Sequence, residues 1–460
     1  MDEVTTIAAL TTSPAPAGIA VIRVSGPSAK KVLKALFRSK KNPSDHPRML
    51  MYGDMIDFKT SEVIDRALAV FMPNPFSFTG EDVAEFQFHG SPFLVQKTLR
   101  SLYAFGISPA EPGEFSKRAF LNGKIDLAQA EAIGDLITAT SEHALKLASE
   151  QMHGRLSSAI KEIGEPLRDS LAELEAHIDF PEEDINPATL DKISASLEIG
   201  LTKVEALLKT YSYGHKVKEG YRVLLCGAPN TGKSSLLNII LGKERAIVSD
   251  ISGTTRDLIE EEALLSNYRF IFCDSAGIRE TSDVVEKMGI ELALDRIPWA
   301  DLVVLVTDSR DEQQEWQKVL GFLKGKAQKI WLLVNKIDLN SAAIGNIYCD
   351  SETCQQNFYV SAKTRAGVDS FISALVNEVT ESNAAHSEST QTITNERHRL
   401  CLDNAKANLL IGLKNILNKV DNEIISADIR NALNSLQEII GVTYTEDILG
   451  RIFSKFCIGK

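Results

Sequence analysis

The sequence predicts a multidomain protein with an α+β N-terminal domain, an all-α helical domain built from two segments, and an α/β domain inserted between those segments. Three observations predict this fold class. The chain has 460 residues, which is too long for a single core. Its middle alternates nearly continuous apolar runs with helical stretches, as in a parallel sheet covered on both faces. On either side of this region, Ala, Leu and Glu recur at helical spacing.

Residues 1–120 are predicted to form the α+β domain. TTIAAL and AGIAVIRVSG are typical of strands, and PSAKKVLKALF has helical spacing with a proline in its first turn. VIDRALAVFM and EDVAEFQFHG predict further strands, and a helix is expected from about Pro92 to Phe105. His89 follows the alternating stretch VAEFQF, and a lone histidine there is more often a turn or capping residue than a catalyst.

The helical domain is predicted in two parts, 121–213 and 380–460. Between two helices of the first part, IDFPEEDINP at 178–187 combines two prolines with four acids and is expected to be a loop. We interpret these acids as solvated, with metal binding as the less favoured alternative. The polar stretch 380–391 is typical of a linker, and helical periodicity resumes from Asn395 to Phe456.

The inserted α/β domain is predicted at 214–379, with strands at YRVLLC, YRFIFCD, LVVLVTD and KIWLLVNK. After the first strand, residues 227–234 match the phosphate-binding pattern G-x-x-x-x-G-K-[ST]. Gly227 and Gly232 let the backbone curl so that its N–H groups face phosphate oxygens. Lys233 can place a charge on the β- and γ-phosphates, and the Ser234 hydroxyl can bind Mg²⁺.

Two further elements suit the γ-phosphate and its metal. GTTRD at 253–257 offers a threonine hydroxyl for the Mg²⁺ shell, for which we choose Thr255. DSAGIRE at 274–280 directly follows a strand, so Asp274 would hold Mg²⁺ through water and the Gly277 N–H would contact the γ-phosphate. Both lie after the phosphate-binding loop, in the order that a GTPase requires.

Two more elements suit a guanine base. In NKID at 335–338, Asp338 can accept from the N1–H and the exocyclic amine of guanine, while Asn335 can read the opposite edge of the ring. A buried acceptor left unfilled by adenine would reject that base strongly. The backbone of SAK at 361–363 is expected to contact the guanine O6. All five elements in this order predict a GTPase.

One residue expected of small signalling GTPases is missing. They place a water-orienting Gln directly after the D-x-x-G element, where this chain has Ile278. The residues alone leave several alternatives open. Acids that could orient the water are Glu280, Asp283 and Glu286. Arg256 and Arg279 could act as arginine fingers within the chain, and the Asn230 carboxamide could help hold a monovalent cation.

Composition excludes several classes of protein. The net charge of −12 argues against a whole-surface grip on nucleic acid, although a local basic patch or a basic partner stays possible. The N-terminal stretch does not resemble a secretory signal, and no apolar run is long enough to span a bilayer. The six cysteines form no C-x-x-C pair, so we expect reduced thiols in a cytoplasmic protein and no structural zinc.

As a set, these residues resemble the MnmE (TrmE) family of tRNA-modification GTPases. The resemblance extends over nearly the whole chain and rests on TGEDVAEFQFHG, PGEFSKRAFLNGKIDLAQAEAIGDLI, IDFPEE, GAPNTGKSSLLN, IVSDISGTTRD and RIFSKFCIGK. It implies an N-terminal domain that dimerises and binds 5-formyl- or 5,10-methylene-tetrahydrofolate. It also implies a homodimer that works with an FAD-dependent MnmG/GidA-type partner. Together they would add a carboxymethylaminomethyl or aminomethyl group at carbon 5 of the wobble uridine of certain tRNAs.

The resemblance also implies roles in the nucleotide site. K⁺ would take the place of an arginine finger, and Glu286 would align the attacking water beside Lys233 and Asn230. The implied metal ligands are Ser234 and Thr255 for Mg²⁺, and Asn230, Ser249, Ile251 and Thr254 for K⁺. The full set of implied nucleotide and cation contacts is Asn230, Thr231, Gly232, Lys233, Ser234, Ser235, Ser249, Asp250, Ile251, Ser252, Gly253, Thr254, Thr255, Asp274, Ser275, Ala276, Gly277, Asn335, Lys336, Asp338, Ser361, Ala362 and Lys363.

For the folate, the resemblance implies a site of four residues, Arg23, Glu81, Lys124 and Lys460. Arg and Lys suit carboxylates of the glutamate tail, and a carboxylate suits the amino-pyrimidine edge of a pterin. Cys457 belongs to the family's C-terminal C-I-G-K motif, either as a nucleophile or as a packed thiol.

Three stretches depart from the family's pattern. SPAPAG at 13–18 stands in place of a PGRGG-like run, and HGSP stands where HGG is usual. Both lie in turns of the expected folate domain. Ser249 stands where a threonine is common, and the change retains a backbone carbonyl for K⁺.

An alternative from another class is a GTPase switch in a ribosome-assembly or scaffold protein, with the N-terminal domain serving only for dimerisation.

Overall fold

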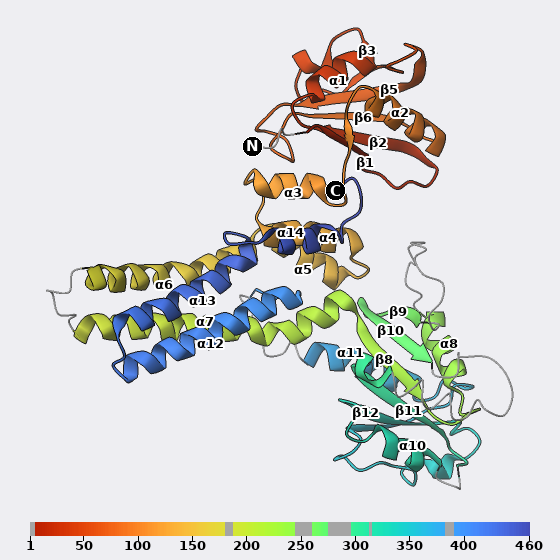
Figure 1. Ribbon diagram of the computed structural model, residues 1–460. Helices are drawn as coiled ribbons and strands as arrows, with labels where there is room; N and C mark the ends of the chain where they lie inside the picture. Colours follow the sequence, from red (N-terminus) through yellow and green to blue (C-terminus); the bar gives the residue numbers. More distant parts are fainter. Residues whose placement is uncertain (1–4, 180–186, 244–259, 275–295, 312–314, 382–390) are drawn as a thin grey trace. The chain divides into compact units, whose positions relative to one another are not determined.

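The computed structural model (Figure 1) describes residues 5–179, 187–243, 260–274, 296–311, 315–381 and 391–460. The chain divides into two compact units. The first comprises Met1–Gly134, Gln151–Arg168 and Arg430–Lys460, and the second comprises Asp135–Glu150 and Asp169–Ile429. Within the described residues, no helix is both long enough and apolar enough to cross a membrane.

A seven-stranded sheet in the order β3-β4-β5-β6-β2-β1-β7 forms the centre of the first unit. Its strands are β1 (Ile7–Leu10), β2 (Ala17–Ser25), β3 (Phe37–Ser39), β4 (Met51–Ile56), β5 (Val63–Met72), β6 (Val83–Gly90) and β7 (Ser108–Pro109). Neighbouring strands are antiparallel except β1 and β7. The predicted strands of this domain are confirmed. His89 lies at the end of β6, where its Nδ1 is 2.8 Å from a carboxylate oxygen of Asp65.

Helices α1 (Ala29–Leu36) and α2 (Pro92–Ala104) share one face of this sheet. Side chains of both helices enter one buried cluster with Ile22 and Val24 of β2. Because side chains alternate along a strand, Arg23 points to the opposite face. On that face, Phe115 of α3 (Glu114–Leu121) packs against Ile7 and Ala9.

The C-terminal segment completes the first unit. Helix α14 (Glu446–Phe453) packs with α3 and with the start of α4 (Leu127–Thr138) in one buried cluster. Beyond α14, Ile458 forms a bridge with Pro112, and the Phe115 N–H donates to the main-chain oxygen of Lys460 at 3.1 Å. A Cβ at Gly459 would lie only 2.0 Å from the Leu10 carbonyl oxygen, so this position requires glycine.

A six-stranded sheet in the order β13-β12-β11-β8-β10-β9 lies in the second unit. Its strands are β8 (Tyr221–Cys226), β9 (Glu260–Leu265), β10 (Tyr268–Asp274), β11 (Leu302–Asp308), β12 (Ile330–Asn335) and β13 (Gln356–Tyr359). All pairs are parallel except β9 with β10. The four strands predicted for the α/β domain are therefore confirmed.

Helices cover both faces of this sheet. One buried cluster joins it to α8 (Lys233–Lys243) and α11 (Val368–Glu381), and another joins it to α10 (Glu315–Leu323). Cys226 and Cys273 lie in these strands as free thiols, and burial raises the pKa of Cys226 to about 12, so its thiol stays protonated.

Long helices lie on either side of the α/β sheet in the sequence. They are α5 (Glu142–Met152), α6 (Arg155–Asp179), α7 (Pro187–Glu219), α12 (Glu396–Leu417) and α13 (Asn422–Ile440). Helices α7 and α12 pack together: Lys406 forms an ion pair with Glu205 at 2.8 Å, and Gly412 lies against Leu197. The predicted loop at 178–187 and linker at 380–391 fall mostly outside the described residues, with α6 ending at Asp179 and α7 beginning at Pro187.

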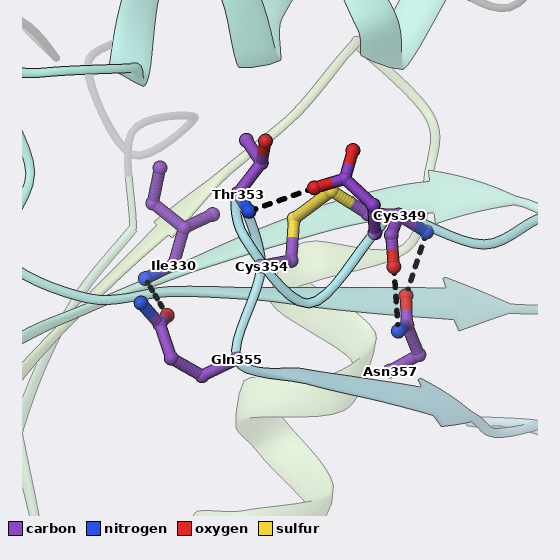
Figure 2. Close-up of a disulfide and its surroundings, with 7 residues drawn as sticks. Ile330, Cys349, Thr353, Cys354, Gln355 and Asn357 are labelled. Atoms are coloured by element: carbon purple, nitrogen blue, oxygen red, sulfur yellow. Dashed lines mark hydrogen bonds between the residues drawn. A yellow bond between two sulfur atoms is a disulfide. The ribbon is translucent and has the colours of Figure 1, made fainter.

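One expectation about the cysteines is wrong. Cys349 and Cys354 form a disulfide in the loop between β12 and β13, with their Cα atoms 5.7 Å apart (Figure 2). The loop turns back locally because the Cys354 N–H donates to the Asp350 carbonyl at 2.8 Å, while the Asn357 amide bonds both main-chain groups of Cys349. A search for C-x-x-C spacing could not find this wider pair. Cys401 and Cys457 are not part of a disulfide.

Candidate functional site

The phosphate-binding loop lies between β8 and α8, at the carboxyl end of a central parallel strand. Its glycines are required by close contacts. Gly227 has a φ of 144°, and a Cβ there would lie 2.0 Å from the Val306 carbonyl oxygen of β11. Gly232 has a φ of 95°, and its Cβ would lie 2.2 Å from Nδ2 of Asn335. The neighbouring strands therefore fix the path of the loop.

Lys233 and Ser234 begin α8, with side chains directed to the loop and to β10. The buried Lys233 Nζ donates to the carbonyls of Gly227 and Ala228, both at 2.9 Å, and burial lowers its pKa. The Ser234 hydroxyl donates to an Asp274 carboxylate oxygen at 2.8 Å. A hydroxyl and a carboxylate this close are the hard oxygen ligands that Mg²⁺ prefers, so the pair fits the predicted metal site.

Asn335 joins three of the predicted elements. Its Nδ2 donates to the Thr231 carbonyl in the phosphate-binding loop at 2.9 Å. Its Oδ1 accepts from the N–H groups of Lys336, at 2.8 Å, and Ala362, at 3.0 Å. Because both lone pairs of Oδ1 are used, only the second Nδ2 hydrogen remains for a ligand.

Lys336 and Asp338 extend this arrangement. Lys336 Nζ donates to the Asn230 carbonyl at 2.5 Å and to Asp308 at 2.8 Å. Asn230 itself adopts a left-handed conformation, with a φ of 63°. The Ser361 hydroxyl donates to Asp338 Oδ1 at 2.6 Å, which leaves Oδ2 as an acceptor for a ligand. These bonds connect the phosphate-binding loop with the NKID and SAK elements.

The structure thus brings together one part of the predicted nucleotide site. The predicted residues that take part in these contacts, or adjoin them in the chain as Ser235 and Lys363 do, are Asn230, Thr231, Gly232, Lys233, Ser234, Ser235, Asp274, Asn335, Lys336, Asp338, Ser361, Ala362 and Lys363. The remaining predicted positions fall outside the described residues, namely Ser249, Asp250, Ile251, Ser252, Gly253, Thr254, Thr255, Ser275, Ala276, Gly277 and Glu286, together with Arg256, Ile278, Arg279, Glu280 and Asp283. Among the described residues, no cluster of three or more His, Cys, Asp or Glu suits a metal ion.

A second polar site lies in the first unit, on the sheet face opposite α1 and α2. Arg23 Nε donates to a Glu85 carboxylate oxygen at 2.8 Å, and its guanidinium lies 5.4 Å from the ring centroid of Phe78 and 5.6 Å from that of Phe115. Phe115 directly follows Glu114 in α3. Lys124 Nζ donates to the Pro75 carbonyl at 3.0 Å.

Arg118 is a residue of this site that the sequence did not predict. Its guanidinium donates to both Glu81 oxygens at 3.2 Å, to Glu114 at 2.7 Å and to the Thr5 carbonyl at 2.7 Å. Glu81 also accepts from the buried Ser25 hydroxyl at 2.6 Å, so one acceptor position remains on its Oε1. Glu114 and Arg118 stand four residues apart on one helix, and this spacing was the available sequence signal.

The four predicted residues of this site come from distant parts of the chain. Arg23 and Glu81 lie at neighbouring strands, Lys124 follows α3, and the main chain of Lys460 is bonded to Phe115. Cys457 is exposed, and its carbonyl accepts from the Gly113 N–H at 3.5 Å. The C-terminal motif therefore packs within the same unit as the other predicted residues.

Comparisons with known proteins match nearly the whole chain. A family model described as the MnmE helical domain matches residues 127–457, and one described as the GTP-binding protein TrmE N-terminus matches residues 6–124. The tRNA modification GTPase MnmE of Geobacter sulfurreducens is 39% identical over 456 residues, which cover 99% of each chain. The protein of the same description from Natranaerobius thermophilus is 39% identical over 459 residues, again covering 99% of each chain.

Proposed function

The chain belongs to the MnmE family of tRNA modification GTPases, and from this premise we propose that it is a K⁺-dependent GTP hydrolase of tRNA wobble-uridine modification. With an FAD-dependent partner of the MnmG/GidA type, it would take part in adding a carboxymethylaminomethyl or aminomethyl group at carbon 5 of that uridine. The observation that carries the proposal is Asn335, which bonds the phosphate-binding loop to the NKID and SAK elements. The phosphate-binding loop would hold the triphosphate and the NKID and SAK elements would hold the guanine, so Asn335 would couple the two parts of one GTP site.

Each group of the assembled loop has a role in this proposal. The Lys233 ammonium would exchange its two carbonyl acceptors for phosphate oxygens, which offset the cost of its burial. Ser234 would bind Mg²⁺ directly, Asp274 would hold it through water, and Thr255 would complete its coordination shell. Bound Mg²⁺ would neutralise charge on the phosphates. The free oxygen of Asp338 would accept from guanine.

Water activation and K⁺ binding involve Asn230 together with groups outside the described residues. We propose that Glu286 aligns the attacking water, and that Asn230, Ser249, Ile251 and Thr254 hold K⁺ against the phosphates. Two observations support this role: Asn230 has a left-handed backbone, and Lys336 bonds its carbonyl, which leaves the carboxamide to a ligand. Bound K⁺ would supply the positive charge that an arginine finger provides in other GTPases.

For the first unit we propose a tetrahydrofolate site, holding a 5,10-methylene or 5-formyl derivative. The residue chemistry fits this ligand. Arg23, Lys124 and Lys460 can pair with carboxylates of the glutamate tail, and Glu81 retains one acceptor position for the pterin edge. Packing of the C-terminal segment beside Phe115 supports the contribution of Lys460.

We further propose the domain arrangement expected from the sequence. The boundaries are 1–120, 121–213, 214–379 and 380–460, with the α/β domain inserted into a helical domain. The packing of α7 on α12 supports it, since these helices lie on either side of the α/β sheet in the sequence. The protein would act in the cytoplasm as a homodimer that joins its FAD-dependent partner in a hetero-oligomer and binds tRNA.

The cation role can be tested by steady-state GTP hydrolysis in KCl and in NaCl at equal ionic strength. We expect faster turnover in K⁺ for the wild type, and loss of the K⁺ stimulation in Asn230→Gly. Glycine retains the left-handed backbone and the carbonyl bonded to Lys336, and removes only the carboxamide. Equal rates of the wild-type protein in both salts would rule out the K⁺ mechanism.

The tRNA role needs a separate measurement. Cells that lack this protein should accumulate wobble uridines without the carbon-5 group, and mass analysis of their tRNA measures this directly. Normal modification in such cells would overturn the tRNA role while leaving the GTPase assignment in place.

A further inference from the structure

A cavity of about 320 Å³ lies in the first unit between α2 and the turn that follows β4. Asp57, Lys59, Phe93, Lys97, Arg100 and Ser101 are among its lining residues. Its volume lies at the lower end of the range that ligand pockets occupy. None of these residues belongs to the sites described above.

Local bonds fix the wall of this cavity. The Phe58 N–H donates to the Ser101 hydroxyl at 2.7 Å, which ties the turn to α2. The Phe58 ring packs edge-on against Phe105, with centroids 5.0 Å apart. Asp57 Oδ1 accepts from the N–H groups of Lys59 and Thr60, both at 2.9 Å. The cavity therefore lies between a turn and a helix that are bonded to each other.

The charge around this cavity is positive. Lys59, Lys97 and Arg100 line it together with one carboxylate, that of Asp57. The main-chain bond from Thr60 lowers the pKa of Asp57, with a smaller contribution from nearby Lys97, so this carboxylate is charged and serves to close the turn. Among the residues that the structure describes, none of the three cations forms an ion pair. A net positive cavity contrasts with the chain's net charge of −12.

An aromatic ring stands beside these cations. Phe93 is 72% exposed, and it shares one face of α2 with Lys97 and Arg100, which follow it by four and seven residues. An exposed phenylalanine next to unpaired cations is poorly suited to a solvated surface. It is well suited to a ligand that offers both a flat ring and phosphates, because bases stack on aromatic side chains while Lys and Arg neutralise the backbone.

The cavity is separate from the proposed folate site. Helix α2 lies on the sheet face of Ile22 and Val24, whereas Arg23 points to the other face. The pairing of Arg118 with Glu81 and the packing of Phe115 also lie on that other face. A ligand in the cavity would therefore leave the folate site free.

We propose that this cavity, with the outward face of α2, binds single-stranded RNA of the tRNA substrate. Lys59, Lys97 and Arg100 contact successive phosphates, and Phe93 stacks on one unpaired base. The inference rests on the proposed tRNA function and adds to it a place of contact. A local patch of this kind is compatible with the acidic net charge of the chain, because electrostatic binding to RNA phosphates needs only a few clustered cations.

The test is tRNA binding by the full-length protein, measured by fluorescence anisotropy over a series of KCl concentrations. In Lys97→Gln/Arg100→Gln we expect an affinity about tenfold lower, and a slope of log K against log[salt] smaller by about 1.4 to 1.8. Phe93→Leu should lower the affinity about fivefold or more with the slope unchanged. GTP hydrolysis without tRNA should be unaffected in both variants.

A matched control removes two charges from the other helix on this sheet face, in Lys30→Gln/Lys34→Gln of α1. Both lysines are exposed and one helical turn apart. An equal loss of affinity in this control would overturn the proposal, because the effect would then follow from net charge alone. Wild-type affinity in Lys97→Gln/Arg100→Gln would overturn it as well. A loss in that variant with none in Phe93→Leu would indicate a plain anion site and overturn the stacking of a base.

The proposed function can fail separately from this inference. If the wild-type protein hydrolyses GTP and supports wobble-uridine modification, but the cavity variants bind tRNA normally, only the cavity proposal is wrong. If cells lacking the protein retain modified uridines and the wild-type protein binds no tRNA, both proposals are wrong.

Discussion

The two sites of this protein are held together in different ways. At the phosphate-binding loop, the critical contacts involve main chain: Gly227 against Val306, and Asn335 bonded to carbonyl and N–H groups of three loops. In the first unit, a charged side chain makes the critical contacts: Arg118 bonds Glu81, Glu114 and the Thr5 carbonyl. One site is a short continuous motif braced by its neighbours, and the other is a charge network assembled from distant segments.

This difference explains which site a sequence reveals. A backbone geometry requires particular residues at fixed spacing, so the glycines and the lysine of the loop form a recognisable pattern. A charge network requires only complementary groups that meet in space, and Thr5, Glu81 and Arg118 have no fixed spacing. The first site should therefore be most sensitive to added atoms, and the second to removed charges.

The largest effect is expected from Gly227→Ala. Its Cβ would lie 2.0 Å from the Val306 carbonyl oxygen at a φ of 144°, so either the loop or β11 must shift. We expect GTP affinity to fall more than about 100-fold, with a loss of stability above about 2 kcal/mol. Binding of a fluorescent GTP analogue and thermal unfolding measure the two effects.

Gly242→Ala is the matched control. This glycine lies in α8, and a Cβ there meets no atom within 4 Å. We expect a gain in stability of about 0.5–1 kcal/mol, because alanine is the better helix former, with normal GTP binding. Normal GTP affinity in Gly227→Ala would show that nucleotide binding does not depend on the close approach of Gly227 to Val306.

The next effect in size is expected from Arg118→Met. The change leaves Glu81 and Glu114, whose side chains are 14% and 20% exposed, without their shared cation. We expect a loss of about 3–5 kcal/mol in the free energy of unfolding of the first unit. Calorimetry measures the loss, and GTP binding is expected to be unchanged.

Lys117→Met provides the control at the adjacent position. The Lys117 ion pair with Glu446 spans 3.6 Å between a partly exposed and a largely exposed side chain, so its loss should cost less than about 1 kcal/mol. If the two variants unfold at the same temperature, the charge network does not hold the first unit together.

The smallest effect is expected from Asp308→Asn, which removes the carboxylate that Lys336 and Arg310 share near the phosphate-binding loop. Hydrogen bonds from Arg310, and then from Lys336, hold the pKa of Asp308 well below its usual range. A lowered folded-state pKa stabilises the protein above the unfolded value, about 3.9, and this contribution is lost as the pH falls below it. The wild type should therefore unfold at a slightly higher temperature than the variant from pH 8 to 5.

The gap between these unfolding temperatures should narrow below about pH 4, because Asp308 then binds a proton in the unfolded protein while its lowered pKa keeps it charged in the folded protein. Unfolding curves of both proteins across this pH range supply the measurement. A gap that widens in acid would contradict the sign of the pKa shift, and a large gap at neutral pH would show that side-chain charges also hold the first site together.

Much of the fold could be predicted because its strands carry strong periodic signals. The buried runs of β8, β10, β11 and β12 were recognised, and the family resemblance is confirmed by matches over the whole chain. Strand β9, with sequence EEEALL, was missed because it is the antiparallel edge strand and its glutamates are partly exposed. Strand β4 contains Gly53, whose lack of a side chain weakens the strand pattern.

The parts of the sites that could not be predicted depend on tertiary contacts. Asn335 was expected to read guanine, but nothing in the sequence indicated that it also braces the Thr231 carbonyl. Arg118 lay within a recognised motif without any indication that its partners would be Glu81 and Thr5. The pairing of Cys349 with Cys354 depended on a local turn held by Asn357.

The packing of the C-terminal segment on α3 has a consequence for the timing of synthesis. Ile458 and Lys460 bond to Pro112 and Phe115, roughly 345 residues upstream, and a ribosome needs about 20–70 s to cover that distance. During this interval the surface of α3 that will receive the segment is exposed to the ribosome, chaperones and proteases. The α/β sheet leaves the ribosome before the N-terminal unit can be finished, so the part of the chain made first is the last to reach its final structure.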